Sequence, residues 1–255
     1  IGTGETEDRA IGTQDDGQYD GNQYVLNFAM SMWGIWYDAA KFEEKGWEYP
    51  QTWDEMLALC EVIKEDGEMA PWTYQGLHPQ YMRIVWDQMV FKAGGWEAMH
   101  KLNNLAEDAW TQPIVIEALQ AFQALADNGY IMEGTEGLSH TESQTFWLQG
   151  EAAFIPCGTF LENEMKEVVD NLPDFQMTVQ PIPNLSENDM LPFSATQAGA
   201  GETFIVFANG NNVQGGKEWL RLLFSKEGAS FCSEAARSPS VVIDAAEGLD
   251  LGSAF

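Results

Sequence analysis

Few side chains in this sequence have the types and spacing that catalysis or metal binding requires. His78, His100 and His140 are the only histidines, and no cysteine or carboxylate joins them at the spacing of metal ligands. The glycine-rich, serine and zinc signatures of nucleotide-binding folds, hydrolases and zinc peptidases are absent. A glycosidase needs two carboxylates, and forty acidic residues offer many pairs, Glu162 and Glu164 among them. Catalysis therefore has no positive indication, and we expect neither a metal nor a cofactor.

The cysteines do not suggest a reactive or metal-binding site either. Cys60, Cys157 and Cys232 are odd in number and widely spaced, and no CxxC pair occurs. This pattern argues against a disulfide framework and a thiolate zinc site. We expect three unpaired thiols in three separate packing contexts.

Sugar binding is a chemistry that the aromatic residues do favour. Trp33, Tyr81 and Phe160 each lie at or near the end of an expected strand or in the loop beyond it. Flat aromatic faces stack on pyranose rings, while a few amide, imidazole and hydroxyl groups bond the sugar hydroxyls. Candidates for the polar groups are Gln75, His78, Gln144, Thr159 and Glu202. Taken singly, each aromatic residue is more often part of a core, so the hypothesis depends on their convergence.

The segment Phe154–Met165, FIPCGTFLENEM, predicts how one of these rings is presented. An apolar strand runs into Gly158, and a carboxylate-rich helix follows. Thr159 is suited to be the N-cap of that helix, with Glu162 as its capping-box partner. Such a turn directs backbone N–H groups and the Phe160 ring beyond the end of the strand, where open α/β sheets bind ligands. The alternative is an ordinary turn with Phe160 in the core.

The elements that must position these residues alternate between strand and helix. Capping boxes begin helices at Thr52 and Ser139, and alternation or apolar runs indicate the strands. Strands are expected over residues 24–38, 70–74, 152–155, 175–180 and 203–208, and helices over 41–46, 52–66, 81–93, 113–128, 139–150, 160–170, 215–224 and 225–236. This alternation is typical of an α/β fold with ligand contacts at strand ends.

Charge and hydropathy limit the partners of the chain. Twelve basic and forty acidic residues give 255 residues a net charge of −28. A chain this acidic is repelled by nucleic acid and by anionic membrane surfaces, so we expect neither as a partner. No apolar run approaches the roughly 18 residues that a membrane span needs. The acidity fits a protein that works outside the cytoplasm or in salty surroundings. No signal peptide is visible, and the chain opens at Ile1.

Three segments together resemble the extracellular sugar-binding proteins of ABC importers, the maltose-binding-protein type of solute-binding protein family 1. They are GIWYDAAKFEEKGW with YPQTWDEMLALCEVIK, then FWLQGEAAFIPCGTFLENEM, then GAGETFIVFANGNNVQGGKEWLRLLFSKEGASFCSEA. Phe160 stands where the family usually has Trp. The combination of APWTYQG, EGLSHTESQTFW, CGTFLENEM and GAGETFIV is most similar to the branch that binds N-acetylglucosamine and diacetylchitobiose. The matches span about residues 24–245.

The resemblance implies a periplasmic-binding-protein-like fold of class II type, with two α/β lobes joined by hinge strands and one lobe incomplete. Residues 1–33 are expected to form part of the N-terminal lobe and a crossing, and residues 34–185 the C-terminal lobe. Residues 186–236 would return to the N-terminal lobe, and residues 237–255 would be a tail or return crossing. The hinge crossings are expected near Met30–Trp33 and Gln180–Leu185.

The function that the resemblance implies is binding without catalysis. The chain would be the carbohydrate-binding subunit of an ABC sugar importer, taking a neutral mono- or oligosaccharide such as N-acetylglucosamine or chitobiose into an interlobe cleft. Its partners would be the sugar and the permease subunits, and it would be a monomer outside the cytoplasm. It would be a cell-surface lipoprotein or periplasmic, with any lipid anchor absent from this chain. The alternatives are a carboxylate-dependent glycoside hydrolase and a sensory binding protein without a role in transport.

Overall fold

The computed structural model describes residues 17–252, which divide into two compact units. Unit 1 contains the chain up to Met32, Glu162–Glu164 and the chain from Ala198 onward. Unit 2 contains Trp33–Leu161 and Met165–Gln197. Parts of the expected first and last segments, residues 1–16 and 253–255, lie outside the described residues.

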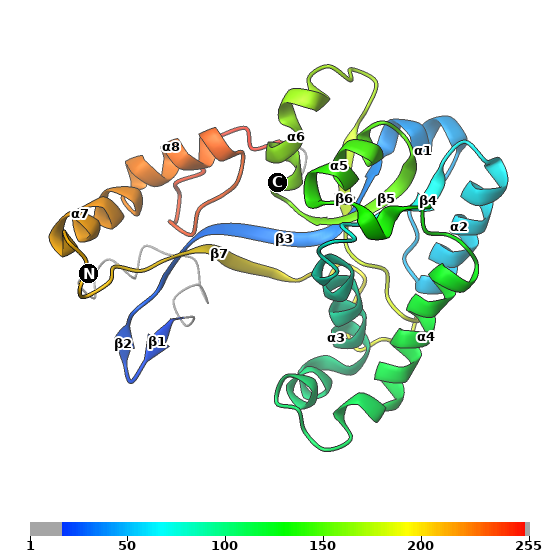
Figure 1. Ribbon diagram of the computed structural model, residues 1–255, viewed down its shortest axis with the longest axis horizontal. Coiled ribbons are helices and arrows are strands. Elements are labelled where there is room, and N and C mark those ends of the chain that lie inside the picture. The colour runs from blue at the N-terminus through cyan, green and yellow to red at the C-terminus, as the bar shows by residue number, and fades with distance from the viewer. Residues whose placement is uncertain (1–16, 253–255) are drawn as a thin grey trace. The chain divides into compact units, whose positions relative to one another are not determined.

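Unit 2 is built on a four-stranded mixed sheet in the order β4-β5-β3-β6 (Figure 1). The strands are β3 (Leu26–Asp38), β4 (Ala70–Trp72), β5 (Ala152–Gly158) and β6 (Met177–Gln180). β5 is parallel to β4, while β3 is antiparallel to both β5 and β6. A Cβ atom at Gly34 would run into the carbonyl oxygen of Gln180. The glycine inside β3 therefore allows the close approach of β6.

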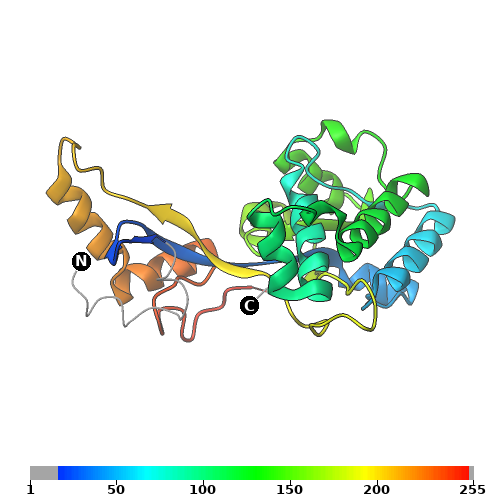
Figure 2. The ribbon, with the colours of Figure 1, turned by 90° about the horizontal axis from the view of Figure 1, so that it is seen from below.

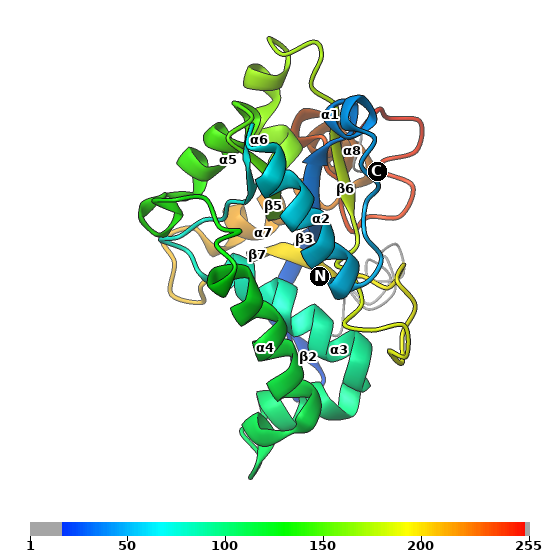
Figure 3. The same cartoon turned by 90° about the vertical axis from the view of Figure 1, so that its right-hand side faces the viewer.

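Helices flank this sheet and extend the unit beyond it. They are α1 (Ala39–Lys45), α2 (Trp53–Asp66), α3 (Gln80–Asn103), α4 (Pro113–Asp127) and α5 (His140–Leu148), with 3-10 turns η2 (Ala109–Thr111) and η3 (Thr135–Gly137). α6 (Leu161–Val169) belongs to unit 2 except for Glu162–Glu164. α3 and α4 lie side by side (Figures 1 and 3). α3 breaks at Gly95, where φ is 65° and ψ is −166°. The helix stop expected at this glycine is thus a kink, after which a second helical stretch continues.

The core of unit 2 is rich in indole rings, and Trp53 and Trp72 each find an acceptor for the indole N–H. Trp53 stacks on Phe122 with ring centroids 5.5 Å apart, and its Nε1 donates to the carbonyl of Ala121 at 2.9 Å. Trp72 Nε1 donates to the Sγ of Cys60 at 3.3 Å. Cys60 and Cys157 are buried and Cys232 is half-buried, and all three are thiols. Burial raises the pKa of the Cys60 thiol to about 12, so it packs as a neutral group.

The capping box expected at the start of α2 is confirmed. The side chain of Thr52 accepts from the N–H of Glu55, and Glu55 Oε2 accepts from the N–H of Thr52 at 3.0 Å. We expect Thr52→Ala to lower the free energy of unfolding by about 1 kcal/mol, because a helix N–H then loses its acceptor. Urea unfolding checks this, with Thr111→Ala, in a short exposed turn, as the control. Equal stability of both variants would contradict it.

Unit 1 contains a ribbon made by the first half of β3 and by β7 (Ala198–Phe204), visible in Figure 2. The remaining elements are β1 (Gln18–Tyr19), β2 (Asn22–Gln23), α7 (Val213–Leu223) and α8 (Lys226–Ala236). Phe28 contacts Phe224 and Phe204 at centroid distances of 5.3 and 6.3 Å. The strand expected at residues 203–208 is wrong in its bounds. The pairing with β3 uses the small residues before Phe204, which the apolar pattern alone did not indicate.

The irregular segment 181–197 belongs to unit 2, which extends to Gln197. Lys92 of α3 gives the physical reason. Its side chain is 1% exposed, and its ammonium donates to the carbonyls of Ile182 and Phe193. The N–H of Leu191 also donates to the carbonyl of Lys92 at 3.0 Å. One buried cation thus fastens both halves of the segment to α3.

Candidate functional site

Four rings from four different elements meet in unit 2, and we call them the ring cluster: Trp33, Tyr81, His140 and Phe160. Trp33 contacts Tyr81 and Phe160 edge-to-face, with centroids 5.3 and 5.5 Å apart. The His140 ring lies 5.2 Å from Tyr81 and 6.2 Å from Phe160. All four rings are half-buried. Three of the sequence-predicted residues, Trp33, Tyr81 and Phe160, are therefore brought together.

The register of β3 and β5 explains why Trp33 and Phe160 meet. Trp33 pairs with Gly158 across the two antiparallel strands, and Phe160 follows two residues later. The Phe160 ring folds back over Gly158, where a Cβ atom would collide with it. Gly158 is therefore needed so that Phe160 can reach the indole of Trp33.

The N-cap role expected for Thr159 is wrong. α6 begins at Leu161 with Phe160 at the N-cap position and no side-chain cap bond, so Glu162 is not a capping-box partner. The Phe160 backbone is already in the right-handed helical region, and Thr159 is 1% exposed. Thr159 is buried inside the unit, one position before the N-cap. Its hydroxyl therefore does not cap α6.

His140 is the member of the ring cluster that the sequence did not single out. It is the first residue of α5, directly after Ser139, whose side chain caps the helix in the expected box with Glu142. Gln144 lies one turn later and is fully buried, with its Nε2 3.0 Å from His140 Nε2 and 4.0 Å from the Sγ of Cys157. The i, i+4 spacing from Gln144 to His140 was the available signal.

The other predicted site residues lie outside the ring cluster. Gln75 is fully buried, and its Nε2 donates to the carbonyl of Pro156 in β5 at 3.1 Å. His78 is exposed in the turn before α3, where its backbone N–H donates to the carbonyl of Gln75. Glu202 is exposed on β7 in unit 1, with φ at 51°. Roles for Gln75, His78, Thr159 and Glu202 in ligand binding stay predictions.

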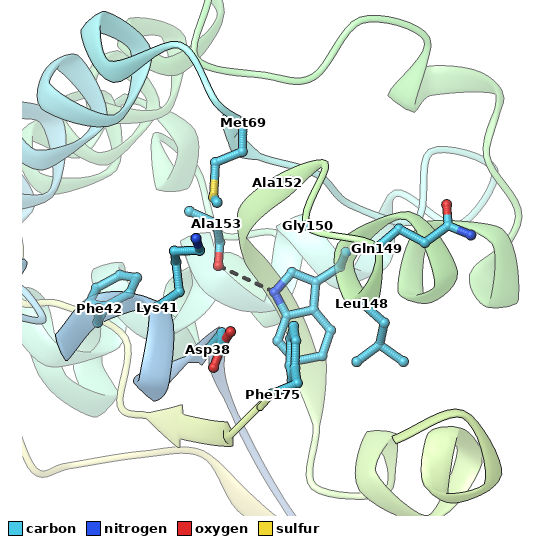
Figure 4. A pocket seen from close by; sticks show the side chains of 11 residues that line it. Asp38, Lys41, Phe42, Met69, Leu148, Gln149, Gly150, Ala152, Ala153 and Phe175 are labelled. Atoms are coloured by element: carbon cyan, nitrogen blue, oxygen red, sulfur yellow. Dashed lines mark hydrogen bonds between the residues drawn. The ribbon is translucent and has the colours of Figure 1, made fainter. Parts of the chain in front are cut away.

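Two hollows in unit 2 lie apart from the ring cluster. One, of about 190 Å³, is lined by Asp38, Lys41, Phe42, Met69, Phe175, residues 147–150, Ala152 and Ala153 (Figure 4). Its Trp147 donates to the carbonyl of Ala153, and its Lys41 pairs with Glu44 at 2.8 Å. The other, of about 290 Å³, lies among α3, α4 and Trp110. Asp38, Lys41 and Trp147 of the first hollow already bond within the chain, so these three groups are not open partners for a ligand.

The ring cluster offers apolar ring faces beside polar tips and carries no carboxylate, Lys or Arg side chain. Among residues 17–252, no three His, Cys, Asp or Glu side chains gather as a metal site. No helix in the described part of the chain is long and apolar enough to cross a membrane. The arrangement can stack on and hydrogen-bond a neutral, partly apolar ligand, which is the chemistry of a sugar.

Comparison with known proteins decides the family. The model of the bacterial extracellular solute-binding protein family matches residues 2–230. The chain belongs to this family. The family is one of binding proteins rather than enzymes, which confirms the expectation of binding without catalysis. It also confirms the expectation of a place outside the cytoplasm.

Relatives of this solute-binding protein include sugar-binding proteins. It is 34% identical over 236 residues to the diacetylchitobiose binding protein NgcE of Streptomyces coelicolor, covering 91% of this chain and 49% of NgcE. It is 25% identical over 162 residues to the multiple sugar-binding protein of Streptococcus mutans, covering 59% of this chain and 37% of that protein. The chain thus spans half or less of the length of these relatives.

Solved structures agree on the fold. RafE in complex with raffinose superposes with a TM-score of 0.78 at 20% identity, covering 94% of this chain and 62% of RafE. A chitin oligosaccharide binding protein gives a TM-score of 0.78 at 16% identity, covering 98% of this chain and 61% of that protein. The predicted fold class, α/β of the periplasmic-binding-protein type, is confirmed.

Proposed function

We propose that this solute-binding protein is the carbohydrate-binding subunit of an ABC sugar importer, and that the ring cluster contacts the sugar. The ligand is a neutral mono- or oligosaccharide, with N-acetylglucosamine and its disaccharide chitobiose as the first candidates. The observation that carries the proposal is the meeting of Trp33, Tyr81 and Phe160 around one point of unit 2. The similarity to a diacetylchitobiose binding protein supports the choice of sugar.

The chemistry of the cluster fits an N-acetylated sugar. Such a sugar presents an apolar ring face, several hydroxyls and an acetamide with one donor and one acceptor. Aromatic faces cover the ring, and indole N–H and phenol O–H groups can bond the polar atoms. An anionic sugar would also meet the repulsion of a chain with net charge −28.

The partners follow from the same proposal. Permease subunits would receive the sugar from the bound form of the protein, because a sugar that prefers one conformation shifts the population toward it. The protein would act as a monomer, held at the membrane by a lipid anchor or moving freely outside the cytoplasm.

The test is calorimetric titration with diacetylchitobiose, N-acetylglucosamine, cellobiose and sialic acid at about 50 and 500 mM salt, across which the Debye length falls severalfold. We expect an N-acetylated sugar to bind most tightly, with an affinity that changes little with salt, because no charge is neutralised. Thermal shift provides a second measurement, since a ligand at 100 times its Kd adds roughly 2.7 kcal/mol of stability.

Two outcomes would overturn the proposal. In the first, none of the neutral sugars binds or raises the melting temperature. In the second, sialic acid binds tightly and loses affinity with salt, which would show that an electrostatic site, and not the uncharged ring cluster, selects the ligand.

A further inference from the structure

We infer that Gln88 is a positioning residue for the proposed sugar site, because its buried carboxamide fixes the backbone of Trp33 and with it the indole of the ring cluster. The inference rests on the proposed function. It concerns a residue of α3 that contacts no other ring of the cluster and that no sequence pattern singled out.

The carboxamide of Gln88 bonds Trp33 in β3 and Gln197, the residue before β7. Its Nε2 donates to the carbonyl of Trp33 at 3.3 Å, and its Oε1 accepts from the N–H of Gln197 at 2.8 Å. The Trp33 N–H donates to the carbonyl of Gln197 at 3.0 Å. The Gln88 side chain therefore bonds the backbones of Trp33 and Gln197, one through its donor and the other through its acceptor.

Thr196 completes this arrangement, which we call the Gln88 network. Its hydroxyl donates to the carbonyl of Trp33 at 2.7 Å and lies 3.3 Å from Gln88 Oε1. Both lone pairs of the Trp33 carbonyl are then in use, and so are both ends of the Gln88 amide. A buried network of this kind favours one geometry, because displacing a member breaks hydrogen bonds that water does not readily replace.

Burial makes the network costly to break. Gln88 is 3% exposed, so water does not readily replace a lost partner. A buried donor or acceptor without a hydrogen-bond partner lowers the free energy of unfolding by roughly 1–3 kcal/mol. Moving the backbone of Trp33 would break these buried hydrogen bonds, so its position is fixed. The exposed part of its half-buried indole is open to a ligand.

α3 holds Trp33 at a second point. Tyr81 and Gln88 lie seven residues apart, which is two helical turns, so they occupy the same face of α3. Tyr81 contacts the Trp33 ring, while Gln88 bonds its carbonyl. The helix thereby fixes both the position of the Trp33 backbone and the angle of its ring. In the sequence, α3 shows only an amphipathic pattern. Gln88 lies on its buried face, where such a pattern predicts an apolar residue.

The test compares the sugar affinity of Gln88→Met and Thr196→Val with that of the wild type. Met fills the space of Gln but makes none of its hydrogen bonds, so we expect Kd to rise roughly tenfold, as for one buried hydrogen bond left unmade. Thr196→Val should weaken binding in the same sense. Thr196→Ser keeps the hydroxyl, so its Kd should equal that of the wild type.

Two controls separate positioning from general destabilisation. Gln112→Met removes a glutamine whose Nε2 bonds the carbonyl of Ala109 before α4, outside the Gln88 network, and should leave Kd unchanged. In a Trp33→Ala background, Gln88→Met should no longer change Kd, because Gln88 acts through the indole that is gone. This double-mutant cycle reports coupling between the two residues, which a merely structural role would not produce.

The outcomes decide between the inference and the proposal beneath it. A wild-type protein that binds no sugar contradicts the proposed function. Wild-type binding with unchanged Kd in Gln88→Met and Thr196→Val overturns the inference alone. So does an effect of Gln88→Met that persists in full without the Trp33 indole. If Gln88→Met does not fold, the Thr196→Val and Thr196→Ser pair gives the same decision.

Discussion

Phe160→Ala is expected to weaken sugar binding by about 1–3 kcal/mol, which is roughly 5- to 150-fold in Kd. The ring contributes its own face and also contacts Trp33 and His140, so its loss removes one wall of the ring cluster and loosens two others. Because Phe160 is half-buried, the free energy of unfolding should change less than the free energy of binding. Calorimetric titration of diacetylchitobiose measures the effect.

Two further variants make this result specific. Phe146→Ala removes a ring from the exposed face of α5, outside the cluster, and should leave Kd unchanged. Gly158→Ala adds a methyl group where the Phe160 ring lies, so it should displace the ring and weaken binding without removing any aromatic face. A folded Phe160→Ala protein with wild-type affinity would take Phe160 out of the site.

The second large effect is a rise in stability with pH that depends on Lys92. Burial lowers the pKa of the Lys92 ammonium to about 8, an effect that the nearby Asp189 carboxylate opposes. An unfolded chain restores the ordinary lysine pKa of about 10.4. Between these values the unfolded state holds more protons than the folded state, so the free energy of unfolding increases with pH. Below pH 8 both states are protonated, and the cost of the buried charge is present in full.

We expect the wild type to gain about 2 kcal/mol relative to Lys92→Met between pH 7 and pH 9.5, since one pKa unit corresponds to about 1.4 kcal/mol. Urea unfolding at a series of pH values gives the difference. The series stops at pH 9.5 because burial raises the pKa of Tyr37 and Tyr49, which lowers stability at higher pH. Lys101→Met, at an exposed pair with Glu97, is the control and should run parallel to the wild type. A Lys92→Met curve that also runs parallel would refute the assignment.

Local sequence patterns predicted most of the fold. Capping boxes at Thr52 and Ser139 mark helix starts because they depend only on residues three apart. The apolar run with Gly34 predicted β3, since a buried strand is apolar on both faces. β7 was misplaced because its small, exposed residues pair through the backbone, which leaves no hydropathy signal.

The meeting of the rings was predictable for residues whose type is conspicuous, and not for residues that matter only through a contact. Trp33, Tyr81 and Phe160 are conspicuous as aromatic residues near strand ends. His140 joins them only because α5 begins beside the turn after β5, and Gln88 matters only because segment 181–197 returns to Trp33. Both depend on contacts between residues far apart in the chain. Thr159 was misjudged because a good capping residue can instead be buried when the turn moves the helix start.

The edge-to-face contacts around Trp33 also have a magnetic consequence. When one ring stands with its edge on the face of another, its protons lie within the shielding region of the π electrons. The ring resonances of Tyr81 and Phe160 would then be dispersed from those of the other aromatic side chains. A change of a few degrees in the tilt of the indole shifts these resonances, whereas the crowded remainder of the aromatic spectrum stays in place. Under the proposed function, these resonances would report the binding of the sugar.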